Sequence, residues 1–412
     1  MMSRAVRLRR LLTASLTAGM FLLTASAGAA QSGITVTVQD NYQADYGVTI
    51  PFTRSPRTTD YTFSLYEGGS AAGTPAVSAK VEMTAAQGDV YLPLAYDITG
   101  PQSYTLKIEA RPLPGRLGTD TAAVREFSFT TKPTCGCASG TAGAFYRGSG
   151  SAADPFYVGS QQQLAHVSAH ARDGSTFLQT VDIDLAGNAW QNFAFIGTYD
   201  GGGHVVRNLK GSYSGSGGLF ASFVGTLMNL GVENANITTT SAFAGALVGS
   251  GQNVVIQCCY AKNCTVSAQG GAGGILGDDL TAIIEDCYEV GGSYTCQGEG
   301  PGGIAGNFDG NQAENAIRRC YAIPTRLTGP MKGILAGKWN YGEMVNCYFP
   351  TNISCGATTA TYKGNVAGST GLPLASFSNA ANFSGWDFAN VWRMDAGAGR
   401  PVLRVFDNPK DS

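Results

Sequence analysis

Hydrophobic and polar residues alternate along the first third of the chain, from Ile34 to Thr131. In stretches such as "DYTFSLYEGG", "SYTLKIEA" and "REFSFTT", every second side chain is apolar or aromatic, which is the pattern of half-buried strands. About seven such stretches occupy roughly 100 residues, as the strands of immunoglobulin and fibronectin domains do. The pattern therefore predicts an immunoglobulin/fibronectin-like β-sandwich over residues 31–132.

A Pro- and Gly-rich stretch, "KPTCGCASGTAG", follows the last of these strands. Such composition favours turns and connecting segments over regular structure, and we interpret residues 133–144 as a linker. Cys135 and Cys137 lie within it, one residue apart.

Beyond the linker, a short pattern of glycine and apolar residues recurs about every 29 residues. It opens with "GGLF" at Gly217, "GALVG" at Gly245, "GGILG" at Gly273, "GGIAG" at Gly302 and "KGILAG" at Lys332. Four of the five copies close with a Cys-Tyr pair, and the first has Asn229-Leu230-Gly231 in that place. The pairs are Cys259-Tyr260, Cys287-Tyr288, Cys320-Tyr321 and Cys347-Tyr348.

Strands this short cannot bury their apolar side chains alone, but successive copies stacked about 4.8 Å apart form continuous sheets around one interior. Glycine interrupts every segment, so no helical period survives. The repeats predict an all-β fold, a right-handed parallel β-helix. Stacking also predicts an interior ladder of small apolar thiols from the four equivalent cysteines, Cys259, Cys287, Cys320 and Cys347. Local disulfides involving Cys264, Cys296 or Cys355 remain open in an exported protein.

These repeats resemble the GLUG motif, whose name describes a Gly-Leu-any-Gly core. The stretch beginning "DPFYVGSQQQL" is similar to the region that precedes such repeats, and "GWDFANVWRMDAGAGRPVLRVF" is similar to their closing strand and cap. The resemblance covers residues 145–406 and leaves 407–412 as a tail. It implies a bacterial secreted or surface protein of adhesin-like type; in the immunoglobulin A peptidases that carry these repeats, the repeats are accessory.

The N-terminus has the three parts of a secretory signal peptide. Four arginines precede an apolar run from Leu11 to Leu23, and "ASAGAA" supplies small residues for cleavage. Residues 1–30 are therefore predicted to be a signal peptide, and the mature chain to be extracellular, without an integral membrane segment. The formal net charge of −2 gives no electrostatic basis for binding nucleic acid.

His166 and His170 are four residues apart in "SQQQLAHVSAHARDG", the spacing of two zinc ligands on a zinc-peptidase helix. Val167 occupies the position of the catalytic glutamate, and the one other histidine is His204. The sequence predicts no metal site here, because the base and a third ligand are missing.

The same stretch has the features of a short capping helix. Ser160 and Gln163 have capping-box spacing, and Leu164 and Val167 share an apolar face, opposite the two histidines. We expect this helix to cover the open first coil, and we expect folding to survive replacement of both histidines by Gln.

Enzyme motifs are incomplete. Pectin hydrolases with this fold use paired carboxylates, a Gly-His-Gly and an Arg-x-Lys. Only Gly277–Asp279 and Gly203-His204 come near, in reversed order and without the basic partner. No Gly-x-Ser-x-Gly elbow occurs, and the repeat cysteines are far in sequence from every histidine. We expect no catalytic residues and no cofactor.

The sequence therefore predicts a non-enzymatic adhesin-like protein that binds an extracellular glycan or protein ligand. Aromatic residues near the repeat loops, Phe308, Trp339 and Tyr341, are the candidate ligand contacts. Two alternatives stay open: a β-helix lyase or glycoside hydrolase that cleaves polysaccharide, and a structural spacer or matrix protein without its own ligand.

Overall fold

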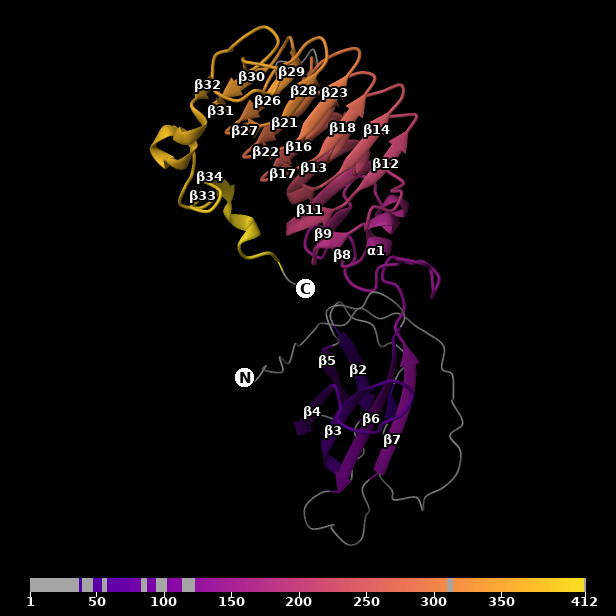
Figure 1. Cartoon of the computed structure of the whole chain (residues 1–412). Helices are drawn as coiled ribbons and strands as arrows, with labels where there is room; N and C mark the ends of the chain where they lie inside the picture. The colour runs from indigo at the N-terminus through magenta and orange to yellow at the C-terminus, as the bar shows by residue number, and fades with distance from the viewer. Residues whose placement is uncertain are drawn as a thin grey trace. The chain divides into compact units, whose positions relative to one another are not determined.

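The computed structural model of the chain describes residues 37–38, 47–53, 58–82, 87–93, 102–112, 123–309 and 314–410 (Figure 1). The expected signal peptide lies outside the described residues. The chain divides after Gly140 into two compact units.

The first unit contains two antiparallel sheets that share one hydrophobic core. Ile50 and Leu92 from one sheet meet Phe63 and Leu106 from the other, and none of these four side chains is exposed. Alternating apolar positions place these residues on the inner faces of the strands. One sheet has the order β1 (Thr37–Val38), β2 (Gly47–Thr53), β5 (Gln87–Pro93); the other has the order β4 (Val77–Glu82), β3 (Thr58–Glu67), β6 (Ser103–Pro112), β7 (Ala123–Thr130).

The second unit is a parallel β-solenoid, which confirms the fold expected from the repeats. Equivalent residues of successive coils pair in register: Tyr260 with Tyr288, Tyr288 with Tyr321, and Tyr321 with Tyr348. The right-handed winding of the solenoid stays a prediction.

The largest sheet of the solenoid wraps around two of its sides and begins with the entry strands. Its strands are β8 (Phe156–Val158), β9 (Thr176–Gln179), β10 (Ile183–Asp184), β11 (Ala194–Arg207), β13 (Phe220–Glu233), β16 (Val248–Gln257), β17 (Tyr260–Lys262), β20 (Leu276–Asp279), β21 (Ala282–Glu285), β22 (Tyr288–Val290), β25 (Ala305–Phe308), β26 (Ala316–Arg318), β27 (Tyr321–Ile323), β29 (Ala336–Trp339), β30 (Glu343–Val345), β31 (Cys347–Pro350) and β32 (Ser369–Leu372).

Two further stacks complete the coils. A five-stranded sheet, with one strand from each of five coils, consists of β12 (Lys210–Tyr213), β14 (Asn236–Thr239), β18 (Thr265–Ala268), β23 (Ser293–Cys296) and β28 (Arg326–Thr328). A three-stranded stack consists of β15 (Ala244–Gly245), β19 (Ala272–Gly273) and β24 (Pro301–Gly302).

Each coil turns a corner at the residue just before its Cys-Tyr pair. Cys258, Asp286, Arg319 and Asn346 all have φ between 50° and 52°, the left-handed conformation that few residues other than glycine adopt. The corner in the first coil is Asn229, with φ 56°. The repeat therefore fixes a backbone geometry at this position, even though the side chain there changes from copy to copy.

Glycine in the repeat core permits close approach between coils. A Cβ at Gly277 would lie 2.5 Å from the carbonyl oxygen of Gly249 and 2.6 Å from backbone atoms of Ala244. Only glycine fits such a contact, which explains why glycine recurs at the equivalent positions Gly249, Gly306 and Gly337, whereas the first coil has Ala221.

Ser160 begins helix α1 (Gln161–His166), as its capping pattern predicts. Its Oγ accepts a hydrogen bond from Gln163 N at 3.1 Å, and Gln163 Oε1 accepts one from Gly159 N at 2.8 Å. The helix is shorter than expected, because the chain tightens into a 3-10 turn at Val167–Ala169. This change of pitch corrects one expectation: His170 does not face away from the core but is buried, with 8% of its surface exposed.

The last part of the second unit, residues 373–410, forms what we call the C-terminal strap. It contains η2 (Leu374–Ser378), η3 (Ala380–Asn382), β33 (Trp392–Asp395), β34 (Arg400–Leu403) and η4 (Arg404–Phe406). Instead of stopping at the last coil, it runs back beside the stacked strands toward the first (Figure 1). Its aromatic residues bury the column of four tyrosines. No helix in the described part of the chain is long and apolar enough to cross a membrane.

Candidate functional site

Outward side chains of the five-stranded sheet form a column of hydroxyl groups. Pairing between strands places Ser212 beside Thr238, Thr238 beside Ser267, Ser267 beside Thr295, and Thr295 beside Thr328. Ser212 and Thr238 are exposed, and the other three are partly exposed. Adjacent hydroxyls are therefore about 4.8 Å apart along the solenoid axis, the spacing of neighbouring strands.

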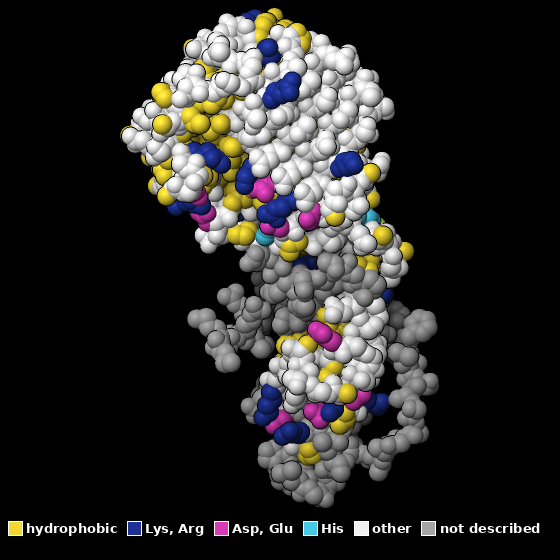
Figure 2. Space-filling model, viewed as in Figure 1, with side chains coloured by type: hydrophobic (Ala, Val, Ile, Leu, Met, Phe, Trp, Pro, Cys, Tyr) yellow, Lys and Arg dark blue, Asp and Glu magenta, His cyan; other side chains and the backbone are white. Residues whose placement is uncertain are grey.

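The surface around this column is polar but almost uncharged. Space-filling atoms over β14, β18 and β23 are mostly neither hydrophobic nor charged, and hydrophobic side chains gather on the side where the strap lies (Figure 2). The two ends of the sheet carry the exposed cations Lys210 and Arg326. A flat face of this kind can form many hydrogen bonds to a polyhydroxylated ligand without a pocket.

Only one of the three aromatic residues proposed as ligand contacts is exposed. Phe308 and Trp339 are 0% and 5% exposed, and their rings stack on each other with centroids 5.0 Å apart. They are core residues of adjacent coils, which corrects the expectation from their proximity to loops. Tyr341 has 54% of its surface exposed, in the turn between β29 and β30.

Asp278 and Asp279, at the end of β20, are held by hydrogen bonds from the next coil. Asn307 donates to Asp278 at 2.6 Å, Asp309 N donates to Asp279 at 2.9 Å, and Asn315 donates to the other oxygen of Asp279. Asp279 is 3% exposed. It therefore fixes the turn rather than facing solvent.

Burial and, to a smaller extent, the charges of Asp279 and Glu299 raise the pKa of Asp278 to about 7, against the hydrogen bond from Asn307. A lysine lies in the same turn region: Lys338 forms ion pairs with Glu299 at 2.7 Å and with Asp309 at 2.5 Å. The cluster therefore combines a carboxylic acid that titrates near neutral pH with a basic neighbour, as acid–base chemistry requires.

The four repeat cysteines lie in the solenoid interior, and none of their surface is exposed. Cys259 N donates to Cys287 Sγ at 3.4 Å, and the thiols of Cys287, Cys320 and Cys347 donate to carbonyls of preceding coils. Burial raises the pKa of these last three thiols well above the usual value. None of the ten cysteines, all of which lie in the described part of the chain, forms a disulfide, so no disulfide links the coils. Protonated, inaccessible thiols of this kind are packing groups.

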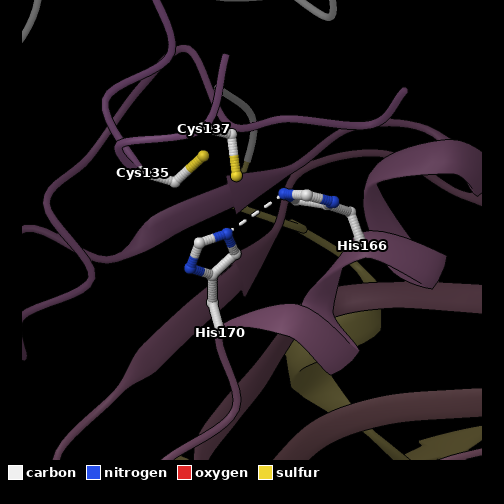
Figure 3. A group of neighbouring side chains, drawn as sticks. All are labelled: Cys135, Cys137, His166 and His170. Carbon is white, nitrogen blue, oxygen red and sulfur yellow. Dashed lines mark hydrogen bonds between the residues drawn. The ribbon is translucent and has the colours of Figure 1, made fainter. Parts of the chain in front are cut away.

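Four metal-ligating side chains form a separate group: Cys135, Cys137, His166 and His170 (Figure 3). Their ligand atoms all lie within 4.8 Å of one another, and the Nε2 atoms of the two histidines are 3.1 Å apart. The third histidine, His204, is engaged elsewhere, beside Asp182 and the carbonyl of Lys410.

Desolvation lowers the pKa of both His166 and His170, and the neighbouring charges of His166 and Arg172 lower that of His170 further. Both rings are therefore neutral near pH 7, with a nitrogen lone pair available. Desolvation and the neighbouring Cys135 raise the pKa of the Cys137 thiol.

Two of these features correspond to no common sequence motif. The hydroxyl column consists of Ser or Thr residues that recur with the period of the repeat, and catalytic motifs do not include such a pattern. The metal-ligand group combines Cys-x-Cys with His-x-x-x-His about 30 residues later. Neither half alone satisfies a zinc-site pattern.

Comparisons with known proteins give limited similarity. No family model matches the sequence. Halomucin of Haloquadratum walsbyi is 26% identical over 205 residues, which are 44% of this chain and 2% of halomucin. The chain thus spans only a small part of that relative's length.

Two solved structures show limited similarity to the chain. A proposed immunoglobulin A1 protease of Bacteroides ovatus has a TM-score of 0.47 at 21% identity, over 63% of this chain and 95% of that one. The pectate lyase PelI of Erwinia chrysanthemi has a TM-score of 0.15 at 11% identity, over 82% of this chain and 99% of that one. Both scores are below 0.5, so neither similarity assigns an activity, and the fold rests on the chain's own strand pairing.

Proposed function

We propose that this chain is a secreted or cell-surface-associated, adhesin-like protein without catalytic activity, which binds a glycan or protein ligand through its solenoid. The observation that carries the proposal is the column of hydroxyls on the five-stranded sheet, Ser212, Thr238, Ser267, Thr295 and Thr328. A glycan is the favoured ligand, because its own hydroxyls pair with such an array along an extended contact.

Several further features support an extracellular scaffold. The repeats resemble GLUG repeats, and the similarity to part of halomucin suggests a surface protein. We also propose that the first unit is an immunoglobulin-like sandwich that acts as a spacer or interaction module, and that α1 caps the first coil. Residues 1–30 would direct export as a signal peptide.

A glycan array and immobilised matrix proteins, probed with the full chain, test the binding proposal. We expect retention on a subset of glycans, with affinity that falls about tenfold or more in a Thr238→Val/Thr295→Val double variant, since each lost hydrogen bond weakens binding by about 1 kcal/mol. Valine keeps the shape and strand preference of threonine, so folding should not change.

Thr370→Val is the matched control, because Thr370 is an exposed threonine in β32, outside the hydroxyl column. Retention on no glycan and no matrix protein would count against binding and favour a structural spacer. Loss of affinity in the control as well would show that the column is not the contact surface.

A second candidate function, polysaccharide cleavage, rests on Asp278, whose pKa is raised to about 7 near Glu299 and Lys338. A carboxylic acid of that pKa can donate a proton near neutral pH. The measurement is the release of new reducing or unsaturated ends from acidic and neutral polysaccharides. Product formation abolished by Asp278→Asn, but not by the exposed control Asp173→Asn, would support an enzyme over an adhesin.

A further inference from the structure

A second column of polar side chains runs beside the hydroxyl column on the five-stranded sheet. Each of its members precedes a residue of the hydroxyl column by two positions, so both side chains point outward, about 6.6 Å apart along the strand. Strand pairing aligns the members from successive coils, which are Lys210, Asn236, Thr265, Ser293 and Arg326. All of them are at least partly exposed. The sheet therefore presents two parallel rows of hydrogen-bonding groups along the solenoid axis.

The residue between the two rows holds each strand in place from the interior. Ile237, Val266 and Tyr294 have no exposed surface, and Leu327 is 3% exposed. Because the strands are also paired in register, the outward groups are ordered before a ligand arrives, which lowers the entropic cost of binding. A ligand that contacts all five coils spans four strand spacings, or about 19 Å.

Most hydroxyls of the column are not used within the protein. Thr328 Oγ1 accepts a hydrogen bond from Arg326 Nε at 3.2 Å. The other four hydroxyls form no hydrogen bond with any described residue of the chain; they belong to Ser212, Thr238, Ser267 and Thr295. Each can therefore donate to a ligand and accept from it, and the hydroxyl groups of a sugar can do the same in return.

The charge and the aromatic content of this face restrict the class of ligand. Both rows are uncharged in the three middle coils, so a polymer with a negative charge on every unit would meet cations only at Lys210 and Arg326. Neither tyrosine of the sheet offers a stacking platform, because Tyr294 is buried and the hydroxyl of the half-buried Tyr213 donates to Trp190 O at 3.0 Å. A sugar ring therefore meets this face with its hydroxylated edge and not by stacking on an aromatic ring.

From this arrangement, and resting on the glycan binding proposed above, we propose that the ligand is a neutral, extended polysaccharide that lies along the solenoid axis, with one sugar unit over each coil. The strand spacing of about 4.8 Å is close to the length of one pyranose unit in an extended β-1,4-linked chain. Successive units of such a chain therefore remain opposite successive coils. A helical α-1,4-linked chain advances much less per unit, so its units cannot all face equivalent groups.

Calorimetric titration of the full chain with β-1,4-linked oligomers of glucose, mannose and N-acetylglucosamine, two to six units long, tests the proposal. In at least one of these series we expect the affinity to rise about two- to fivefold with each added unit up to five units and then to level off, because each unit forms a hydrogen bond with one more coil. The α-1,4-linked glucose oligomers are the matched ligand control and should show no such rise.

Ser267→Ala removes a hydroxyl from the middle of the column. It should lower the affinity for the six-unit ligand about two- to fivefold. The dissociation constant of the two-unit ligand should hardly change, since the coils on either side still offer two pairs of adjacent hydroxyls, Ser212 with Thr238 and Thr295 with Thr328. Thr370→Val, outside the column, is the protein control and should change neither value. Circular dichroism confirms that each variant is folded.

An affinity that stops rising at two or three units would place the ligand across a single coil and would overturn the inference. Equal gains with length in the α- and β-linked glucose series would overturn it as well. So would retention of the chain on other glycans when none of the three β-1,4-linked series binds, although the proposed glycan binding would then stand. Retention on no glycan at all would remove the proposed glycan binding and this inference together.

Discussion

Glu289 is a carboxylic acid in the interior of the solenoid, where the neighbouring coils have alanine. It pairs in register with Ala261 and Ala322, and it has no exposed surface. Gly292 N donates to its Oε1 at 2.7 Å, while Oε2 has no hydrogen-bond partner among the described residues. Burial raises the pKa of this group from 4.5 to about 8.

This pKa makes stability depend on pH. The folded chain holds the proton more tightly than the unfolded chain, so the contribution is complete below pH 4.5, falls as pH rises, and is lost once pH passes about 8. We expect the melting temperature to fall across this window by an amount equivalent to a few kcal/mol. In Glu289→Ala, which restores the residue of the flanking coils, the decline should become smaller, and the part due to Asp278, whose pKa is also raised, should remain. An equal decline in both proteins would contradict this assignment.

Gly277 should tolerate no side chain, because its place between coils leaves no room for a Cβ. Gly277→Ala is expected to lower the free energy of unfolding by about 1–3 kcal/mol, since backbone rather than a flexible side chain must move. Gly215→Ala is the control, as a Cβ there meets nothing within 4 Å. Chemical denaturation measures both, and equal stability of the two variants would refute the close-approach explanation.

For individual residues, the sequence predicts the role of the backbone more readily than the surroundings of the side chain. The recurring glycines and the cap at Ser160 follow from local geometry, which the sequence encodes directly. Phe308 and Trp339 were misplaced because loop proximity says nothing about which way a side chain points.

The C-terminal strap is the element that the repeats do not predict. Trp392 is fully buried in it, donates from Nε1 to Asp286 at 3.0 Å, and packs on Trp386 with ring centroids 4.2 Å apart. The hydroxyl of Tyr321 donates to Pro401 O at 2.7 Å. The contacts with Asp286 and Tyr321 join the strap to two successive coils, so its docking contributes to the stability of both.

Trp392→Ala should lower the free energy of unfolding by about 3–5 kcal/mol, because it leaves a cavity against the tyrosine column and removes the partner of Asp286. Hydrogen exchange should show faster exchange along the strap and the Cys-Tyr strands. Leu374→Ala, at a strap residue with 38% exposure, should change stability by less than about 0.5 kcal/mol. Unchanged exchange in Trp392→Ala would mean that the strap is held by other contacts.

For the elements, the repeat pattern predicted parallel strands and their stacking because the same short segment recurs at a nearly constant interval. The strap lacks such repetition, and its aromatic residues, Trp386 and Trp392, resemble a terminal cap in composition. Its path along the side of the solenoid is set by long-range contacts with the tyrosines, which become visible only in three dimensions.

In the whole molecule, seven of the ten cysteines are buried, and Cys135, Cys137 and Cys258 are partly exposed. A thiol reagent should therefore label at most these three in the native state. The four interior thiols Cys259, Cys287, Cys320 and Cys347 should react only on unfolding, and at one common rate, because the strap couples the coils. Mass spectrometry of the labelled peptides measures each rate. Earlier labelling of Cys347 would indicate that the last coil frays independently.

The strap has one more consequence, for how the molecule can evolve. Repeat proteins ordinarily change length by gaining or losing a unit, since each coil contacts only its neighbours. Here the strap starts after the last coil, and its Lys410 side chain reaches Asp200 near the first, at 2.6 Å. Because the strap has a fixed length, it would be too short to span a solenoid with a duplicated coil and longer than needed after the deletion of one. We therefore expect selection to keep the number of coils at five while the residues on the outer face of each coil vary.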